Sequence, residues 1–193
     1  MSDFSSRVPS SHSDQDGWIV PGTVEWNLNM ATKKTLSINN RREIGGEAVW
    51  SLSSAKPGNG VQQIRDDNVD TYWQSDGQQP HLINIIFNKK VSLLEVAFYL
   101  DYNLDESYTP KRMSVRAGNT AHDLEEVRAI DLNEPMGWVN IPLYALDDKG
   151  EQTTLRAFYL QICVVSMHQN GRDTHIRQAK VFGPRLSLNS TSG

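Results

Sequence analysis

Residues 168–177 carry an unusual density of side chains that can bind a ligand or transfer protons. They read His168-Gln169-Asn170-Gly171-Arg172-Asp173-Thr174-His175-Ile176-Arg177. Asn-Gly favours a tight turn with positive φ, so Asn170-Gly171 alone predicts a turn. A turn needs only two or three such residues, and Arg172 can pair with Asp173 at little energetic gain. The remaining polar side chains predict a recognition surface formed by this loop.

A histidine beside a carboxylate can act as a general acid or base, and His175 lies two residues from Asp173. His168 and His175 lack the spacing of a zinc-binding His-Glu-x-x-His helix, and the sequence contains no Gly-x-Ser-x-Gly elbow. The lone cysteine, Cys163, lies inside an apolar run rather than at a helix start. These observations favour binding over catalysis, and we expect no catalytic residues.

A second polar segment, 65–77, is rich in Asp, Asn, Thr and Ser, whose short side chains bond nearby backbone groups. Two interpretations are open. Either the segment is a self-bonded corner with Trp73 as its buried plug, or Gln74, Ser75 and Asp76 contact a ligand. Its aspartates offer oxygen donors for calcium, but the spacing of an EF-hand loop is absent, so we predict no metal and no cofactor.

A third polar segment, 105–110, reads Asp105-Glu106-Ser107-Tyr108-Thr109-Pro110. Pro110 biases the residue before it towards an extended backbone. Ser107 and Tyr108 could point at a ligand, although a loop of this composition needs no ligand to exist.

The elements around these loops are predicted to be strands, because short runs rich in β-branched and aromatic residues alternate with Gly, Asn, Asp and Pro. Inward and outward positions alternate in 82–87, in 113–117 and in 158–164, where Phe158, Leu160, Ile162 and Val164 should face the core. Short helices are expected only at 61–65 and 123–127. The predicted strands are 49–53, 82–87, 91–102, 113–117, 127–132, 138–143, 156–165 and 177–182.

The composition is that of a globular domain: 193 residues, 22% of them charged, with a formal net charge of -4 and one cysteine. The interspersed charges argue against nucleic acid as a partner, and no apolar run is long enough for a membrane span. A single thiol indicates a reducing compartment, so we expect the nucleus and cytoplasm. The polar leader, 1–40, is predicted to be mostly irregular, although Trp18-Ile19-Val20, Val24 and Trp26 are too apolar for a plain linker.

Several of these motifs together resemble the DOC domain, in the form found in the small DOC-domain subunits of the anaphase-promoting complex. The resemblance covers about 41–184, leaving 185–193 as a short tail. The motifs that carry it include Arg65-Asp66-Asp67-Asn68, Thr71-Tyr72-Trp73-Gln74-Ser75-Asp76-Gly77, Asp105-Glu106-Ser107-Tyr108-Thr109-Pro110 and the whole of 168–177.

The resemblance implies an all-β, jelly-roll β-sandwich of the galactose-binding, discoidin-like type. It also implies a non-catalytic subunit that forms a receptor for destruction-box degrons with a WD-repeat propeller co-activator, on the core subunits of the complex. The positions that match the family's degron-facing residues are Ser107, Asn170 and His175, with Arg172 and Asp173 in the same loop.

One departure concerns the C-terminus, where the family usually ends in an Ile-Arg dipeptide that docks on a tetratricopeptide-repeat subunit. This sequence ends Leu188-Asn189-Ser190-Thr191-Ser192-Gly193, so tail docking is not carried over. A different class of function stays open on the same fold, a discoidin-like module that binds a carbohydrate or another small ligand through Gln74, Ser75 and Asp76.

Overall fold

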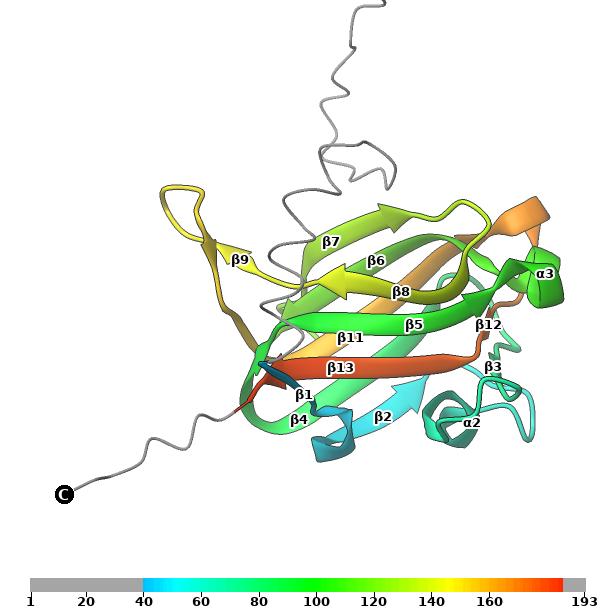
Figure 1. Cartoon of the computed structure of the whole chain (residues 1–193), viewed down its shortest axis with the longest axis horizontal. Helices are drawn as coiled ribbons and strands as arrows, with labels where there is room; N and C mark the ends of the chain where they lie inside the picture. Colours follow the sequence, from blue (N-terminus) through cyan, green and yellow to red (C-terminus); the bar gives the residue numbers. More distant parts are fainter. Residues whose placement is uncertain (1–39, 186–193) are drawn as a thin grey trace, which may run out of the picture.

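The structure, a computed structural model, describes residues 40–185 as two antiparallel sheets packed face to face (Figure 1). The five-stranded sheet has the order β2 (Ala48–Leu52), β4 (His81–Leu93), β11 (Leu155–Met167), β6 (Pro110–Gly118) and β7 (Glu125–Asp131). The four-stranded sheet has the order β1 (Arg41–Glu43), β13 (Gln178–Pro184), β5 (Glu95–Asp101) and β8 (Met136–Pro142). The predicted all-β sandwich is confirmed.

The core lies between the sheets and is built from every second residue of each strand. In β4, Ile83 and Ile85 are fully buried while Ile86 is 45% exposed, as the period of two predicts. Leu160 and Ile162 of β11 also reach the core. Phe158 does not, and its predicted core position is wrong, because the pairing of β11 with β4 shifts between Ala157 and Tyr159.

That shift also explains why one long strand replaces an expected break. Ala157 pairs with Val91 and Tyr159 with Ile86, so four residues of β4 lie opposite one residue of β11. The polar residues 88–90 are thereby exposed, and the strand resumes at Val91. A polar interruption that predicts a turn is therefore absorbed as an irregularity within β4.

Helices are short, and sequence patterns located one of them correctly. The predicted helix 61–65 is α2 (Val61–Arg65), which begins where the Gln63 side chain accepts a hydrogen bond from the Gly60 N–H at 2.9 Å. The predicted helix 123–127 is wrong, because β7 begins at Glu125 and pairs with β6. Alternating side chains on a half-exposed edge strand explain the confusion.

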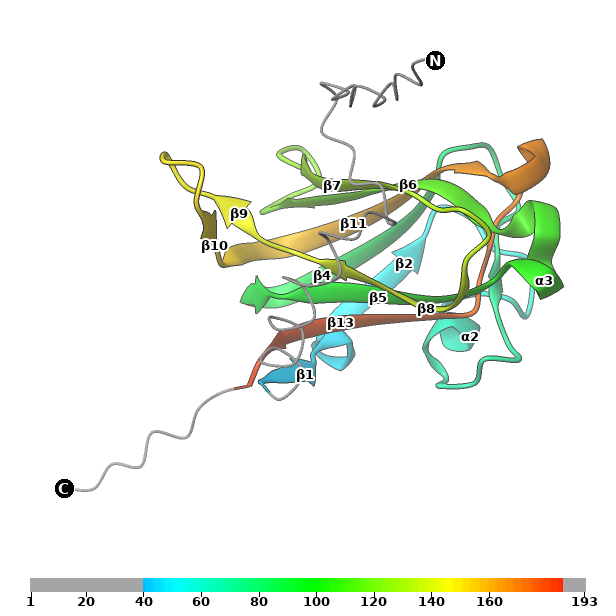
Figure 2. The same ribbon diagram turned by 45° about the horizontal axis from the view of Figure 1, so that its top comes forward.

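The polar loops gather at one end of the sandwich, at the right in Figures 1 and 2. This end holds α3 (Tyr102–Asp105), the 3₁₀ turns η2 (Glu106–Tyr108) and η3 (His168–Asn170), and the two-stranded pair β3 (Trp73–Gln74) and β12 (His175–Ile176). The hairpin of β9 (Ala145–Leu146) and β10 (Gln152–Thr153) projects from the other end. The predicted leader, with Trp18 and Trp26, and the tail beyond Arg185 lie outside the described residues. No helix within 40–185 is long and apolar enough to cross a membrane.

The two neighbouring isoleucines of β4 provide a test of this arrangement. Ile85→Ala should lower the free energy of unfolding by about 2 to 5 kcal/mol, because it leaves a cavity between the sheets. Ile86→Ala should change it by about 0.5 kcal/mol or less, since that side chain already meets water. Urea denaturation of both variants measures the difference, and equal effects would contradict the assigned faces.

Candidate functional site

The loop end of the sandwich is built around a buried carboxylate, that of Asp105 at the end of α3. Asp105 is 4% exposed and accepts hydrogen bonds from Arg177 through both of its oxygens, at 2.8 and 2.9 Å. Arg177 is itself buried and also donates to the Val69 carbonyl at 2.9 Å. Two-point pairing of this kind fixes the guanidinium in one orientation. Three separate segments of the chain are therefore joined at one point.

His175, on β12, completes this buried cluster. Its Nδ1 lies 3.0 Å from a carboxylate oxygen of Asp105, so Nδ1 carries the hydrogen and donates it. The imidazole is stacked between the rings of Tyr72 and Tyr108, with centroid distances of 4.2 and 4.1 Å. Its other nitrogen, Nε2, is enclosed and has no hydrogen-bond partner among the described residues.

The electrostatics of the cluster hold Asp105 in its charged form. Burial raises the pKa of the Asp105 carboxyl. Hydrogen bonds from His175 and Arg177 and the charge of Arg177 together lower it by more than burial raises it, so the pKa lies below its ordinary value. An ionised carboxylate can accept all of these hydrogen bonds at once. The cluster is thus satisfied everywhere except at Nε2 of His175.

Four of the predicted recognition residues lie in the loops that adjoin this cluster, and we call them the rim: Ser107, Asn170, Arg172 and Asp173. Asn170 and Arg172 are exposed, and neither side chain has a partner among the described residues. Ser107 is half-buried, and Asp173 accepts a hydrogen bond from Ser75 Oγ at 3.1 Å. His175, by contrast, is 8% exposed. The structure therefore places four of the five predicted residues on the rim and the fifth beneath it.

The two loops that carry the rim residues approach each other closely at a glycine. Gly171 has an ordinary φ of -59°, yet a Cβ at this position would lie 1.8 Å from the Ser107 carbonyl oxygen. The loop after η3 can therefore approach η2 only because residue 171 has no side chain. Thr174 adds a second tie, since its hydroxyl donates to the Tyr108 carbonyl at 3.2 Å.

The second polar segment, 65–77, is a self-bonded corner. Trp73 is fully buried and donates from Nε1 to the Ser54 carbonyl at 2.9 Å, as expected of a plug. Asp66 accepts hydrogen bonds from Thr71 and Gln178 at 2.7 Å each. These bonds account for the polar composition of the segment without a ligand.

The secondary candidates at the end of this corner differ in exposure. Gln74 and Ser75 are buried, with 9% and 0% exposure, and Gln74 pairs with His175 across β3 and β12. Ser75 accepts a hydrogen bond from the Thr174 N–H at 2.9 Å, and only Asp76 is exposed. The structure brings this segment against the rim, where Ser75 supports it from below.

Sequence reasoning did not single out the residues that hold the cluster together. Tyr72, Asp105 and Arg177 are not predicted as site residues, because no short-range spacing marks a contact between residues 72 positions apart, as Asp105 and Arg177 are. His168 was counted among the recognition side chains, but it is buried. It donates from Nδ1 to the Thr109 carbonyl at 3.0 Å and accepts from the Glu134 N–H at 3.1 Å, which makes it a structural tie.

Replacing the central carboxylate should destabilise the chain strongly. Asp105→Asn leaves the buried Arg177 without a counter-charge, and we expect a loss of about 3 to 5 kcal/mol in the free energy of unfolding at neutral pH. Asp131→Asn is the matched control, because the Arg112–Asp131 pair is more than two-fifths exposed and should contribute about 1 kcal/mol or less. Chemical denaturation measures both, and equal losses would contradict the buried cluster.

The native chain and the Asp105→Asn variant also give a pH test. Because the folded-state pKa of Asp105 is lowered, its stabilisation is present above the unfolded-state value of about 4 and is lost as the pH falls through the folded-state value. The difference in unfolding free energy between the native chain and Asp105→Asn should shrink below about pH 4. A difference independent of pH from 7 to 3 would contradict this assignment.

The contact at Gly171 predicts a steric effect. Gly171→Ala should cost about 1 to 3 kcal/mol, because the new methyl group must displace the Ser107 carbonyl. Gly46→Ala is the control, since a Cβ there would meet nothing within 4 Å. Thermal denaturation of both variants provides the measurement, and an unaffected Gly171→Ala protein would show that η2 and the following loop are not in contact.

Comparison with solved structures identifies the fold. A family 32 carbohydrate-binding module of Clostridium perfringens in complex with galactose superposes with a TM-score of 0.59 at 14% identity, covering 74% of this chain and 98% of that one. A pair of such modules from the same organism's ZmpB gives a TM-score of 0.62 at 13% identity over 90% of this chain and 43% of that one. At these identities the likeness shows the discoidin-like jelly roll alone.

Comparison of sequences identifies the family. Proteins named "Anaphase-promoting complex subunit 10" from Mus musculus and Homo sapiens are both 56% identical over 143 residues, 74% of this chain and 75% of theirs. The Dictyostelium discoideum protein of the same name is 52% identical over 149 residues, 77% of each chain. The family model described as "Anaphase-promoting complex, subunit 10" matches residues 23–192. The predicted DOC-domain resemblance is confirmed, and the chain belongs to the family of anaphase-promoting complex subunit 10.

Proposed function

We propose that this subunit of the anaphase-promoting complex is a non-catalytic substrate receptor that binds destruction-box degrons together with the propeller co-activator. The observation that carries the proposal is the rim, whose exposed Asn170 and Arg172 side chains have no structural role among the described residues. Polar groups held on a rigid base without internal partners are available for a ligand. Family membership supports the setting, a multi-subunit ubiquitin ligase.

The rim suits a short extended peptide. The amide of Asn170 can both donate and accept hydrogen bonds, and the Arg172 guanidinium adds several donors, so together they can bond a peptide backbone and polar side chains. The half-buried hydroxyl of Ser107 stands beside them, since its own carbonyl is packed against Gly171. The four rim side chains are all polar, which fits a shared receptor in which the co-activator binds the apolar anchor of the degron.

In this proposal His175 acts mainly as a support. Its side chain is 10% exposed, its Nδ1 is committed to Asp105, and both ring faces are covered by tyrosines. Replacing it would disturb the positions of the rim residues above it as well as any direct contact with the degron.

The geometry also supports a non-catalytic role. A general base needs an accessible nitrogen within hydrogen-bond reach of the reacting group. The unpaired Nε2 of His175 is enclosed by its neighbours, and Asp173, the carboxylate two residues away in the sequence, accepts a hydrogen bond from Ser75 instead of from His175. Cys163, which the sequence places inside an apolar run, is buried, and burial raises the pKa of its thiol, so the thiolate nucleophile is disfavoured.

Weak binding at two points is sufficient for this role. When the co-activator already holds one part of the degron, the rim binds the rest at an effective concentration in the millimolar range, depending on the connecting segment. The expected consequence is a longer residence of the substrate and the addition of longer ubiquitin chains. We propose the nucleus and cytoplasm as the compartments, in agreement with a free, buried thiol.

The alternative, a carbohydrate-binding module, has less support from the site. Two of its three candidate side chains, Gln74 and Ser75, are buried and Ser75 bonds within the chain. A thermal-shift screen with galactose and related sugars should leave the melting temperature unchanged. A saturable shift that is lost in Asp76→Ala would favour the alternative.

The decisive test removes the two exposed rim side chains without disturbing the fold. Asn170 has a φ of 54°, which alanine adopts at a cost, so Asn170→Gly combined with Arg172→Ala is the preferred variant. In the reconstituted complex with co-activator, we expect destruction-box substrates to dissociate about fivefold faster, the equivalent of about 1 kcal/mol, and to receive shorter ubiquitin chains.

The matched control is Lys149→Ala with Glu151→Ala, two exposed residues of the β9–β10 hairpin at the opposite end of the sandwich. Incorporation into the complex is measured in parallel by co-purification and should be unchanged in both variants. Normal chain length with the rim variant fully incorporated would overturn the proposed receptor role.

A further inference from the structure

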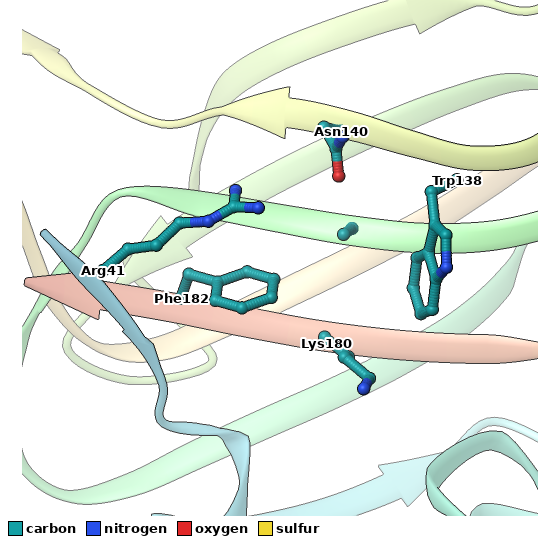
Figure 3. Close-up of a pocket in the computed structure, with 6 residues that line it drawn as sticks. Arg41, Trp138, Asn140, Lys180 and Phe182 are labelled. Atoms are coloured by element: carbon teal, nitrogen blue, oxygen red, sulfur yellow. The ribbon is translucent and has the colours of Figure 1, made fainter. Parts of the chain in front are cut away.

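A shallow depression lies on the outer face of the four-stranded sheet (Figure 3). Its volume is about 320 Å³, and it is lined by Arg41, Ala97, Trp138, Asn140, Lys180 and Phe182. The hollow forms because the small side chain of Ala97 sits in one cross-strand row between Lys180 and Asn140, with larger residues on either side. The floor is therefore a methyl group and the walls are aromatic rings and cations.

The aromatic wall of this depression is exposed to an unusual degree. Trp138 is 43% exposed, and Met136, two residues earlier on the same face of β8, is 66% exposed. The indole is held upright by an edge-to-face contact with Tyr99, whose ring centroid lies 5.6 Å away at 82°. An apolar surface that is fixed in position is suited to burial against another segment.

Two cations border the rings. The Arg41 guanidinium lies 4.3 Å from the centroid of Phe182, and the Lys180 ammonium lies 5.5 Å from that of Trp138. Each also has a carboxylate partner, Glu95 for Arg41 and Asp67 for Lys180. Guanidinium and ammonium groups have further donors to offer, so an incoming carboxylate can share them. The depression therefore fits a segment that carries both apolar rings and acidic side chains.

Such a segment occurs in this chain, upstream of Arg41 in the sequence. Residues 14–26, which we call the acidic tryptophan segment, read Asp14-Gln15-Asp16-Gly17-Trp18-Ile19-Val20-Pro21-Gly22-Thr23-Val24-Glu25-Trp26. It contains three carboxylates, two tryptophans and neither Lys nor Arg. The proposed receptor function does not involve the acidic tryptophan segment.

The connection is short enough for the segment to reach the site. Trp26 precedes Arg41 by 15 residues, and Arg41 itself lines the depression. Fifteen residues span at most about 50 Å when extended and about 20 Å on average as a flexible coil. A connection of this length gives an effective concentration of the order of millimolar, so the segment is mostly bound if its intrinsic dissociation constant lies well below a millimolar.

We propose that the acidic tryptophan segment docks into this depression, where at least one of its tryptophans packs on Trp138 and Phe182 and its carboxylates face Arg41 and Lys180. The docking is intramolecular and is independent of the rim. It covers the apolar outer face of the four-stranded sheet in the free chain.

Fluorine NMR of the full chain labelled with 5-fluorotryptophan tests this directly, because the five tryptophans give five signals that single substitutions assign. Trp138→Ala should shift the signals of Trp18 or Trp26 towards their positions in the isolated peptide 14–26. Trp18→Ala with Trp26→Ala should in turn shift the Trp138 signal. The signals of the buried Trp73 and half-buried Trp50 report whether each variant keeps its fold.

The control is Val49→Ala, which removes an exposed side chain from β2 in the other sheet and should leave all five signals in place. Signals of Trp18 and Trp26 that do not respond to Trp138→Ala in a folded protein would overturn the proposal. A response that disappears on dilution would also overturn it, because it would show a second copy as the occupant.

A second measurement adds the peptide 14–26 to the Trp18→Ala, Trp26→Ala protein. The Trp138 signal should move saturably, and Lys180→Glu should weaken the binding about tenfold or more, since it places a like charge beside the peptide's carboxylates. Absence of saturable binding, or equal binding by the Lys180→Glu protein, would contradict the proposed occupant. If core subunits of the complex bound this face and the peptide did not compete, the face would belong to them instead.

Discussion

One buried carboxylate determines the shape of the functional end of this protein. Asp105 ends α3, His175 lies in β12, Arg177 directly precedes β13, and Arg177 also donates to the Val69 carbonyl. Without these bonds the polar groups of the loops would be free to bond water. A charge-assisted network in a low-dielectric setting gives them one arrangement, because each donor has one acceptor it can reach. The network therefore fixes the positions of the loops that carry the rim residues.

The sandwich supplies the platform and the loops supply the chemistry. The two sheets bury alternate side chains and tolerate irregularities such as the expanded register of β4 opposite Phe158. The close approach at Gly171 and the tie from Thr174 to Tyr108 then bring two distant loops to within contact of each other. Recognition by such a surface depends on positions that are fixed before the ligand arrives, which reduces the entropy lost on binding.

The fold could be predicted from the sequence to a large extent, because alternation in segments such as 113–117 has a direct physical cause in the two faces of a strand. The two wrong predictions also have physical causes. Phe158 sits at an irregularity that no local pattern reveals, and residues 123–127 alternate weakly on an edge strand.

The rim residues were located from their density around one turn and from the family resemblance. The burial of His168 and His175 cannot be predicted in this way, because it depends on Thr109, Asp105 and two tyrosines from other loops. The partnership of Asp105 with Arg177 is likewise a long-range contact, which spacing along the chain cannot show.

The side chains of the buried cluster bond one another, whereas the exposed rim side chains of Asn170 and Arg172 have no partner among the described residues. This difference has an evolutionary consequence. Substitutions at Asn170 or Arg172 remove no internal bond, while substitutions at Asp105 or Arg177 break several at once. In the proposed receptor, degron preference can therefore change through substitutions at the surface without loss of foldability, while the buried cluster limits which positions can change. Under the proposed function, the surface could then adapt to changes in its substrates at little cost to the stability of the fold.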